Sequence, residues 1–423
     1  MKSTPDQLAQ RLAAELGAGS VSLDADLLTS HCVDGKQPAL VCTPDREQVS
    51  AALRLCAEAD ATVSPWGGGT AMALGNPPRQ VEVVLNTGRL DRVIDHDPAN
   101  LTVTAESGIS LAALQQLLAG QRQFVPVDPP FPERSTVGGI VAANLNGPRR
   151  SYYGSVRDLV IGMKVVLISG ERIKAGGKVV KNVAGYDMCK LFVGSLGTLG
   201  VITEVTLRLA PLPESSETAR ASGTLAQAQK FADELLHSPL LPAAVVLLQG
   251  QAPECWQIAA RFEGFVETIS RCRGDLTALA DRLGMSAEFF GGEGQNEFWQ
   301  ARQNVPLQSE RLVFRITLPR AEVFDFIPRI KNWHGAAISA DVAIGTVWLA
   351  CQASKASALR FTELAGMMNS CGGHVIIFAA PSDLKHGLEV WGLSPPTLPL
   401  MRRIKHQFDP AGLLNPGRFV GSL

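Results

Sequence analysis

The sequence predicts an α+β protein built in two parts, and three observations support this. Short strands fill the first half, and one of them runs straight into three consecutive glycines at residues 67–69. Residues 211–223 are polar, contain two prolines and a glycine, and show no hydrophobic periodicity, which is typical of a boundary. Beyond this stretch, strands and helices alternate, which predicts a small antiparallel sheet covered by helices.

Each expected element follows from a local pattern of apolar residues and breakers. A helix capped by Thr4 opens the chain, and a second helix, opened by Pro44, has apolar residues at helical spacing. The other elements expected in the first half are strands at 38–43, 61–65, 81–86, 92–96 and 101–106, a helix at 110–120, a hairpin at 159–175 and a strand at 200–211. In the second half they are strands at 243–248, 256–262, 312–318, 346–351 and 374–379, helices at 225–237, 264–283, 321–331 and 355–370, and a helix with a turn-rich tail over 402–420.

Composition excludes several classes of protein. The chain has 423 residues, 46% of them hydrophobic, which is enough for two or three folded units. Its net charge is -1 and no basic stripe stands out, so no nucleic-acid partner is expected. None of the eight cysteines pairs at CxxC spacing, which argues against a zinc site or an iron–sulfur cluster and favours a reducing, cytoplasmic compartment. Without a signal peptide or a long apolar run, we expect a soluble protein that meets a membrane only through partners.

The glycine run in SPWGGGTAMALG (residues 64–75) raises the question of a ligand. A strand that ends in bare backbone presents N–H groups to a phosphate, and Thr70 can add a hydroxyl. Neither GxxxxGK[ST] nor GxGxxG fits this spacing. Taken alone, the triplet is interpreted equally well as a structural turn.

Three further stretches change that balance: STVGGIVAANLNG (135–147), SYYGSVRD (151–158) and GSLGTLGVIT (194–203). With the glycine run, and in this order, they resemble the FAD-binding domain of the vanillyl-alcohol oxidase / p-cresol methylhydroxylase (PCMH) superfamily. KNVAGYD (181–187), the leucine at position 196 in GSLGTLG and the closing FDPAGLLNPGRF (408–419) resemble the smaller FAD-binding subunit of bacterial glycolate oxidase complexes. Lactate and glycolate catalytic subunits usually carry glutamate in that GSEGTLG position.

This resemblance implies a two-part PCMH-type FAD-binding domain at residues 1–212. An α+β, ferredoxin-like cap domain follows at 213–400, and a C-terminal segment at 401–423 returns to the FAD domain.

The resemblance also implies the residues that bind FAD. The glycine loop would wrap the pyrophosphate, and the later motifs would line the flavin, its ribityl chain or the adenosine portion. The implied cofactor-binding residues are Trp66, Gly67, Gly68, Gly69, Thr70, Ala71, Pro129, Thr136, Gly138, Gly139, Asn144, Tyr153, Gly200, Val201 and Ile202. Covalent-flavin members carry a histidine in or near the first loop, so Thr70 and Ala71 favour a non-covalent FAD.

The sequence identifies no catalytic base. Related catalytic subunits carry HxGDGNxH in the cap; here the only comparable pair is His374 with His386, without the signature, so no metal site is predicted. Asn415 is interpreted equally well as a flavin contact or as a turn cap. Five arginines are candidates to face a substrate carboxylate, and the sequence does not choose among them: Arg302, Arg311, Arg315, Arg402 and Arg403.

The resemblance implies an FAD-dependent oxidoreductase, and specifically a subunit of a glycolate oxidase (dehydrogenase) that converts glycolate to glyoxylate. Its partners would be a sister FAD-containing catalytic subunit and an iron–sulfur subunit that passes electrons on. Two alternatives remain open: a self-sufficient FAD-dependent 2-hydroxy-acid or sugar-alcohol oxidase, and a non-catalytic assembly subunit.

Overall fold

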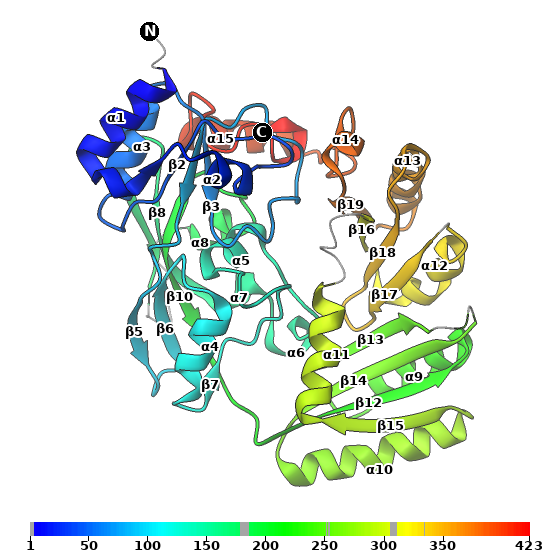
Figure 1. Ribbon diagram of the computed structural model, residues 1–423. Helices are drawn as coiled ribbons and strands as arrows, with labels where there is room; N and C mark the ends of the chain where they lie inside the picture. The colour runs from blue at the N-terminus through cyan, green and yellow to red at the C-terminus, as the bar shows by residue number, and fades with distance from the viewer. Residues whose placement is uncertain (1–3, 178–185, 251, 253, 305–310, 334) are drawn as a thin grey trace.

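The chain forms two lobes. The computed structural model describes residues 4–177, 186–250, 252, 254–304, 311–333 and 335–423. Figure 1 shows the two lobes side by side, with the sheets of the first half on the left and an eight-stranded sheet on the right. Helices and strands are mixed throughout, so the predicted α+β class is confirmed.

The first sheet of the left lobe has the strand order β1-β2-β4-β3, and its last three strands are parallel. Helices α1 and α3 pack together on it, and the predicted N-cap Thr4 forms a capping box with Gln7. Because β3 and β4 are parallel, both end at the same edge of the sheet, where the glycine run begins. The elements are α1 (Pro5–Leu16), η1 (Ala18–Ser20), β1 (Val21–Ser22), α2 (Ala25–Ser30), β2 (Leu40–Cys42), α3 (Val49–Glu58), β3 (Val63–Trp66) and β4 (Val83–Asn86).

The second sheet of this lobe is antiparallel, with the order β5-β6-β10-β8-β9. The predicted hairpin is present as β8 and β9, and Gly170 in its turn has a φ of +83°. Short helices that the sequence did not predict connect the strands. The elements are β5 (Val93–Asp97), β6 (Thr102–Glu106), α4 (Leu111–Ala119), β7 (Gln123–Phe124), α5 (Val137–Ala143), α6 (Arg150–Tyr153), α7 (Val156–Leu159), β8 (Val160–Val166), β9 (Arg172–Gly176), α8 (Cys189–Phe192), β10 (Val201–Arg208) and β11 (Ala210–Pro211).

The right lobe contains one sheet with the order β15-β12-β14-β13-β17-β18-β16-β19, in which neighbouring strands are antiparallel. It consists of two ferredoxin-like βαββαβ units joined edge to edge through β13 and β17. The second half therefore contains two such small sheets joined into one, where the sequence predicted a single small sheet. The first unit contains β12 (Ser215–Gly223), α9 (Leu225–Leu236), β13 (Ala244–Gln249), β14 (Trp256–Gly264), α10 (Val266–Arg282) and β15 (Ser286–Gly291). The second contains β16 (Arg311–Thr317), η3 (Arg320–Glu322), α12 (Val323–Ile330), β17 (Ala337–Asp341), β18 (Thr346–Gln352), α13 (Lys355–Ser370) and β19 (His374–Ala379).

The polar stretch 211–223, which the sequence indicates as a domain boundary, contains a strand that its lack of hydrophobic periodicity did not predict. Most of it is β12, which pairs along its whole length with β14. Helix α11 (Gly292–Asn304), which was also not predicted, connects the two units.

The two faces of the cap sheet have different neighbours. Along β16, Leu312, Phe314 and Ile316 belong to the core beneath the cap helices. Val313 points the other way and belongs to the core shared with the left lobe, as does Ile376 of β19. Because successive side chains of a strand alternate between faces, one face of β16, β18 and β19 looks toward the left lobe.

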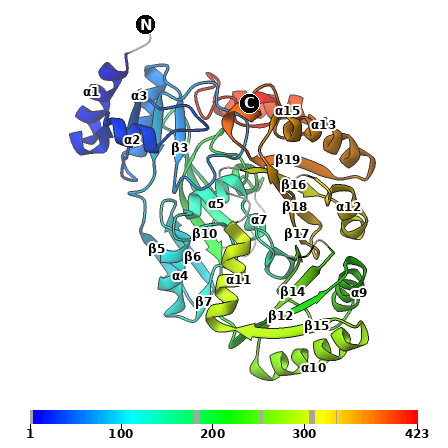
Figure 2. The ribbon, with the colours of Figure 1, turned by 45° about the vertical axis from the view of Figure 1, so that its right-hand side comes forward.

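The C-terminal segment returns to the first sheet, and Figures 1 and 2 both show it at the top of the molecule beside β3. Leu414 forms a parallel bridge with Val63, and the Asn415 N–H donates to the carbonyl of Val63 at 2.9 Å. This segment therefore extends the edge of the sheet that carries the glycine run. The elements that follow β19 are α14 (Ser382–Lys385), which precedes this segment, α15 (Leu398–Phe408) and η4 (Val420–Ser422).

An ion cluster joins the two lobes. Arg149 and the Tyr153 hydroxyl, both from the left lobe, donate to the Glu263 carboxylate of β14 at 2.5 Å and 2.7 Å. Arg261 lies 2.7 Å from the same carboxylate, and Asp128 lies 3.5 Å from Arg149. Burial alone would raise the pKa of Glu263, but the charges of Arg149 and Arg261 outweigh it and the pKa is lowered. We call these five residues the interlobe ion cluster.

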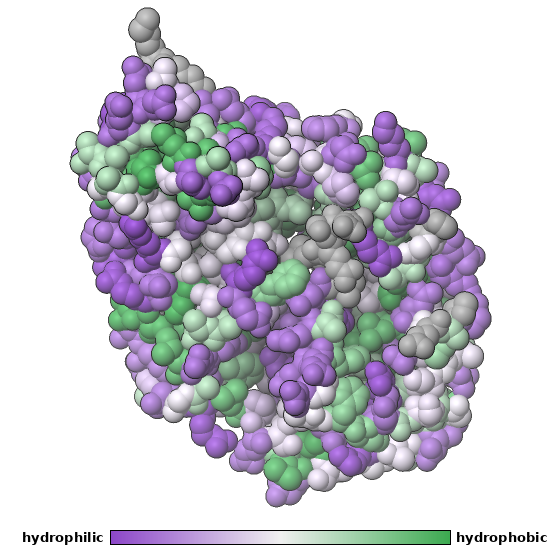
Figure 3. Space-filling view, viewed as in Figure 1, coloured by the Kyte–Doolittle hydropathy of each residue, from purple (hydrophilic) through white to green (hydrophobic). Residues whose placement is uncertain are grey.

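The surface is mixed in character. On the face shown in Figure 3, hydrophilic and hydrophobic residues are interspersed over most of the area. Within the described ranges, no helix combines the length and apolar character needed to cross a bilayer.

Candidate functional site

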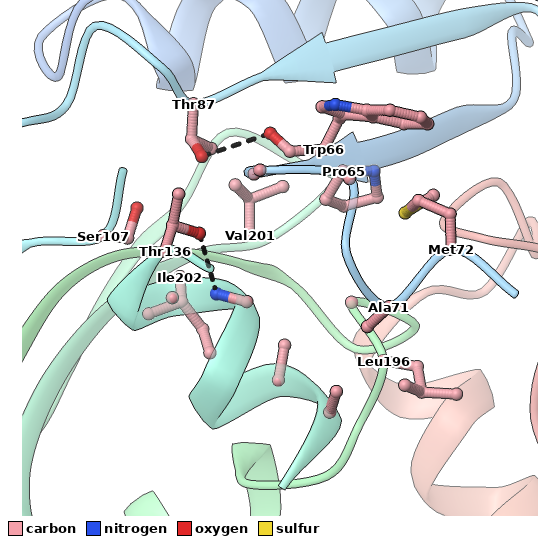
Figure 4. Close-up of a pocket in the computed structure, with 18 of the residues that line it drawn as sticks. Pro65, Trp66, Ala71, Met72, Thr87, Ser107, Thr136, Leu196, Val201 and Ile202 are labelled. Atoms are coloured by element: carbon pink, nitrogen blue, oxygen red, sulfur yellow. Dashed lines mark hydrogen bonds between the residues drawn. The ribbon is translucent and has the colours of Figure 1, made fainter. Parts of the chain in front are cut away.

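A cavity lies at the edge where β3 and β4 end, and it encloses about 740 Å³ counted out to its open mouth. Its walls come from the glycine loop, from α5, from the turn before β10 and from the C-terminal segment (Figure 4). We call it the glycine-loop cavity. The residues that line it are Pro65, Trp66, Gly67, Gly68, Gly69, Thr70, Ala71, Met72, Thr87, Ser107, Thr136, Gly138, Gly139, Ala142, Ala143, Leu196, Gly197, Gly200, Val201, Ile202, Asn415 and Arg418.

The backbone of residues 67–71 offers donors to this cavity. Within the described part of the chain, no group accepts a hydrogen bond from these five N–H groups. Successive free amides that face one cavity form a concave cluster that attracts anions. Hydrogen bonds connect the loop to residues 130–135. The hydroxyls of Thr70 and Ser135 are 2.8 Å apart, and Ser135 donates to the carbonyl of Pro130 at 2.6 Å.

Helix α5 forms the opposite wall. Thr136 is its N-cap and accepts from the N–H of Gly139 at 3.2 Å (Figure 4). A Cβ at Gly138 would come within 2.6 Å of the Ser107 side chain, so this glycine permits close packing. A Cβ at Gly139 would meet only the Thr136 hydroxyl, at 3.1 Å, so its open side faces the cavity.

Three of the residues that line this cavity each have a buried polar side-chain atom without a hydrogen-bond partner. The atoms are Ser107 Oγ, Asn415 Oδ1 and Arg418 Nε. A buried polar atom left unpaired costs about 1–3 kcal/mol. Their gathering in one cavity therefore indicates a ligand that carries both donors and acceptors.

Arg418 also holds the loop that continues from the glycine run. Its guanidinium donates to the carbonyls of Met72 and Leu74 at 2.8 Å and 2.6 Å and lies 3.7 Å from Asp34. Lys385, fully buried, donates to the same Asp34 at 2.9 Å. Desolvation lowers the pKa of Arg418, and the Asp34 charge partly opposes this.

The structure brings most of the predicted site residues together. The glycine loop from Trp66 to Ala71, the residues Thr136, Gly138 and Gly139, and the run 200–202 all line the glycine-loop cavity. Asn144 ends α5 with a φ of 48° and lines a neighbouring cavity instead. Residues 178–185, which hold most of KNVAGYD, lie outside the described residues.

Two predicted site residues lie elsewhere. Tyr153, implied by the resemblance to bind FAD, belongs to the interlobe ion cluster, where its phenol donates to Glu263 and its ring packs edge-on against Phe124. Pro129 is buried next to Asp128 of that cluster and does not line the cavity. Neither residue lines the glycine-loop cavity, so their contact with the cofactor stays a prediction.

Several cavity residues were missed. Thr87 and Ser107 directly follow β4 and β6, so a hydroxyl at a strand end was the available signal. Met72 directly follows the glycine loop, so its position next to the loop was the available signal. Arg418 reaches the cavity only because the C-terminal segment folds back to it.

The charged candidates divide clearly. Arg302 is buried in an ion pair with Asp341, and Arg311 donates to two backbone carbonyls. Arg402 and Arg403 are exposed on α15. Arg315 lines a cavity between the lobes. In the described ranges, no three His, Cys, Asp or Glu residues gather as a metal site.

The sequence matches two known protein families. Residues 38–176 match the family described as FAD binding domain, and residues 391–419 match FAD linked oxidases, C-terminal domain. Glycolate oxidase subunit GlcE of Escherichia coli is 32% identical over 340 residues, which cover 78% of this chain and 85% of GlcE. Glycolate oxidase subunit GlcD of Bacillus subtilis is 28% identical over 422 residues, which cover 90% of this chain and 88% of GlcD.

The fold also matches a solved structure. The structure of p-cresol methylhydroxylase with substrate bound superposes with a TM-score of 0.71 at 16% identity, covering 98% of this chain and 96% of that one. The predicted PCMH-type fold is therefore confirmed. With this fold, the two family matches and the identity to GlcE, the chain belongs to the FAD-linked oxidases and is an FAD-dependent oxidoreductase.

Proposed function

We propose that the chain is the FAD-carrying subunit of a complex that oxidises glycolate to glyoxylate. The observation that carries the proposal is the glycine-loop cavity, whose lining residues include five with free backbone N–H groups and three with an unpaired buried polar side-chain atom. The resemblance to GlcE over most of both chains supports the choice of glycolate.

The residues present fit FAD. The N–H groups of residues 67–71 would receive the pyrophosphate, because two anionic phosphates need several donors and no side chain in the way. Ser107, Asn415 and Arg418 would pair with polar atoms elsewhere on the cofactor. When bound, FAD supplies an acceptor for the two electrons that leave an alcohol carbon. Neither histidine nor cysteine is among the described residues that line the cavity, which supports a non-covalent cofactor.

The complex would contain a sister FAD-containing catalytic subunit and an iron–sulfur subunit, through which any membrane association would occur. The relatives GlcE and GlcD are both named as subunits, which supports this arrangement. All eight cysteines here are free and five are buried, so an iron–sulfur cluster would belong to a partner.

A second candidate is a self-sufficient FAD-dependent 2-hydroxy-acid oxidase. The observation that favours it is the position of Arg315 and His374, which both line a cavity between the lobes. Such a pair would suit the binding of a hydroxy acid within this chain.

One experiment tests the cofactor and separates the candidates. The chain is purified alone, its visible spectrum is recorded, and acid precipitation is used to release the flavin. We expect a yellow protein whose flavin appears entirely in the supernatant. Flavin retained on the pellet contradicts the non-covalent cofactor, and a colourless protein points to an assembly subunit. Anaerobic bleaching by glycolate favours the self-sufficient enzyme.

A further inference from the structure

The cap sheet carries a cation on the face that looks toward the left lobe. Arg315 lies two residues after Val313 on β16, so both side chains project from the same face. The neighbouring positions on this face are apolar: Trp348 of β18 and Phe378 of β19 belong to the core that includes Val313. A guanidinium among such residues requires a polar partner.

Arg315 has no such partner within the described part of the chain. Its guanidinium lies over the Phe378 ring, 5.5 Å from the centroid, and no described group accepts a hydrogen bond from it or pairs with its charge. Two other arginines with little exposure are paired: the buried Arg302 with Asp341, and the half-buried Arg149 with Glu263. Desolvation lowers the pKa of Arg315 to about 10, and the charge of Arg150 adds to this effect.

The space in front of Arg315 is a cavity between the lobes, which encloses about 1380 Å³ counted out to its open mouth. We call it the interlobe cavity. It shares Ala143 and Leu196 with the glycine-loop cavity, so the two spaces adjoin. Arg315 is the only charged side chain among the described residues that line it. Most of the other walls are apolar.

A second donor lies beside the guanidinium. Asn144 lines the interlobe cavity, and with Arg315 it also lines a smaller polar cavity that contains Arg150. The Asn144 Oδ1 accepts from Asn146 at 2.9 Å, so its own amide N–H₂ is left to donate. His374 lies at the edge of the interlobe cavity, where partial desolvation and the Arg315 charge lower its pKa and favour the neutral imidazole.

We propose that Arg315, assisted by Asn144, binds the carboxylate of a small 2-hydroxy acid in the interlobe cavity. An arginine fork matches a carboxylate through two parallel hydrogen bonds, and the adjoining glycine-loop cavity would hold FAD next to the bound acid. This inference rests on the proposed function, and it places the substrate site within this chain rather than only in a partner.

The test uses the FAD-loaded full-length chain and two probes of matched size, glycolate and its uncharged amide, glycolamide. Thermal shift and the difference spectrum of the flavin are read against probe concentration. We expect glycolate to bind saturably and glycolamide to have no effect. In Arg315→Gln, glycolate affinity falls at least about tenfold, as expected for a lost charged hydrogen bond. Arg315→Lys keeps the charge without the fork and retains part of the affinity.

Arg402→Gln is the matched control, because Arg402 is exposed on α15, and its affinity should equal that of the unaltered chain. Equal binding of glycolate and glycolamide, or no binding of glycolate, overturns the proposal without the use of any variant. An unchanged glycolate affinity in Arg315→Gln, accompanied by a shifted flavin potential, overturns it in favour of a contact to the cofactor. Flavin content is measured in parallel. A chain that lacks FAD contradicts the proposed function, whereas a chain that contains FAD but does not bind glycolate contradicts only the carboxylate site.

Discussion

The glycine triplet has two interpretations at the scale of single residues. A Cβ at Gly68 would lie 1.6 Å from the carbonyl oxygen of Arg134, and one at Gly67 would lie 2.2 Å from the Thr136 hydroxyl. The loop thus requires glycine to pack against residues 134–136. The N–H groups of the same residues, which line the cavity, have no acceptor among the described residues. The structural interpretation of the triplet is therefore supported, the ligand-binding interpretation stays a prediction, and a substitution at Gly68 would disturb packing before it tested phosphate binding.

Gly139 is the better position for a test. In Gly139→Asp the new side chain has no close contact except the Thr136 hydroxyl, and an acidic residue in the first turn of a helix is favourable. Its carboxylate would enter the cavity and repel the phosphates. We expect at least a tenfold loss of FAD affinity, about 1.4 kcal/mol, with an unchanged circular dichroism spectrum.

The control for this variant is Gly274→Asp, on the exposed face of α10, where a Cβ meets nothing within 4 Å. It should retain its flavin. Full flavin content in Gly139→Asp, measured as flavin absorbance per chain, would show that this wall does not contact the cofactor.

The site was predictable where it is contiguous in sequence. Residues 66–71 and 136–139 form runs whose composition is itself a signal. Thr87, Ser107 and Arg418 are single polar residues that meet only because β4, β6 and the C-terminal segment converge. Tyr153 shows the opposite case. It lies in a motif that matches the family, but its hydroxyl donates a hydrogen bond to Glu263 of the other lobe.

At the scale of elements, β12 shows why the sequence underpredicts the cap. Its buried residues include Ala219 and Ala221, which pack beneath the cap helices without producing a strong hydrophobic signal. The large side chains of this core come from neighbouring strands, such as Phe262 on β14. Strand pairing on both sides, with β14 and β15, therefore stabilises a segment whose own sequence resembles a linker.

The interlobe ion cluster is expected to hold β14 to the left lobe. Glu263→Gln keeps the shape of the side chain but removes the charge that faces Arg149 and Arg261, which leaves Asp128 as the one carboxylate of the cluster beside these two partly buried cations. We expect a loss of about 3 kcal/mol in the free energy of unfolding and faster proteolysis between the lobes. Chemical denaturation and limited proteolysis measure the two effects.

The pH dependence of this effect follows from the lowered pKa of Glu263. The charge contributes fully above the ordinary glutamate pKa of about 4.3, and its contribution is lost as the pH falls through the lower folded value. The difference in the free energy of unfolding between Glu263→Gln and the unaltered chain should thus become smaller only at acidic pH. The control, Glu288→Gln, removes an exposed partner of Arg220 and should cost less than about 1 kcal/mol. Equal losses in the two variants would contradict a structural role for the cluster.

At the scale of the whole molecule, the chain is expected to depend on partners for sustained turnover. Its cysteines are free, and the described residues hold no metal cluster to carry electrons onward. With a soluble quinone as acceptor, adding the two presumed partner subunits should raise glycolate oxidation at least about tenfold over the isolated chain. Omitting either partner is the control. Rapid turnover by the chain alone would instead favour the self-sufficient oxidase.

The return of the C-terminal segment to β3 also sets an order of events during synthesis. Domains made on the ribosome generally fold from the N-terminus onward. Here the loop after the glycine run is held by Arg418, and the edge strand β3 is completed by Leu414. The glycine-loop cavity therefore takes its described shape only after the whole cap has been translated, and we expect FAD to bind after synthesis of the C-terminal segment rather than during translation.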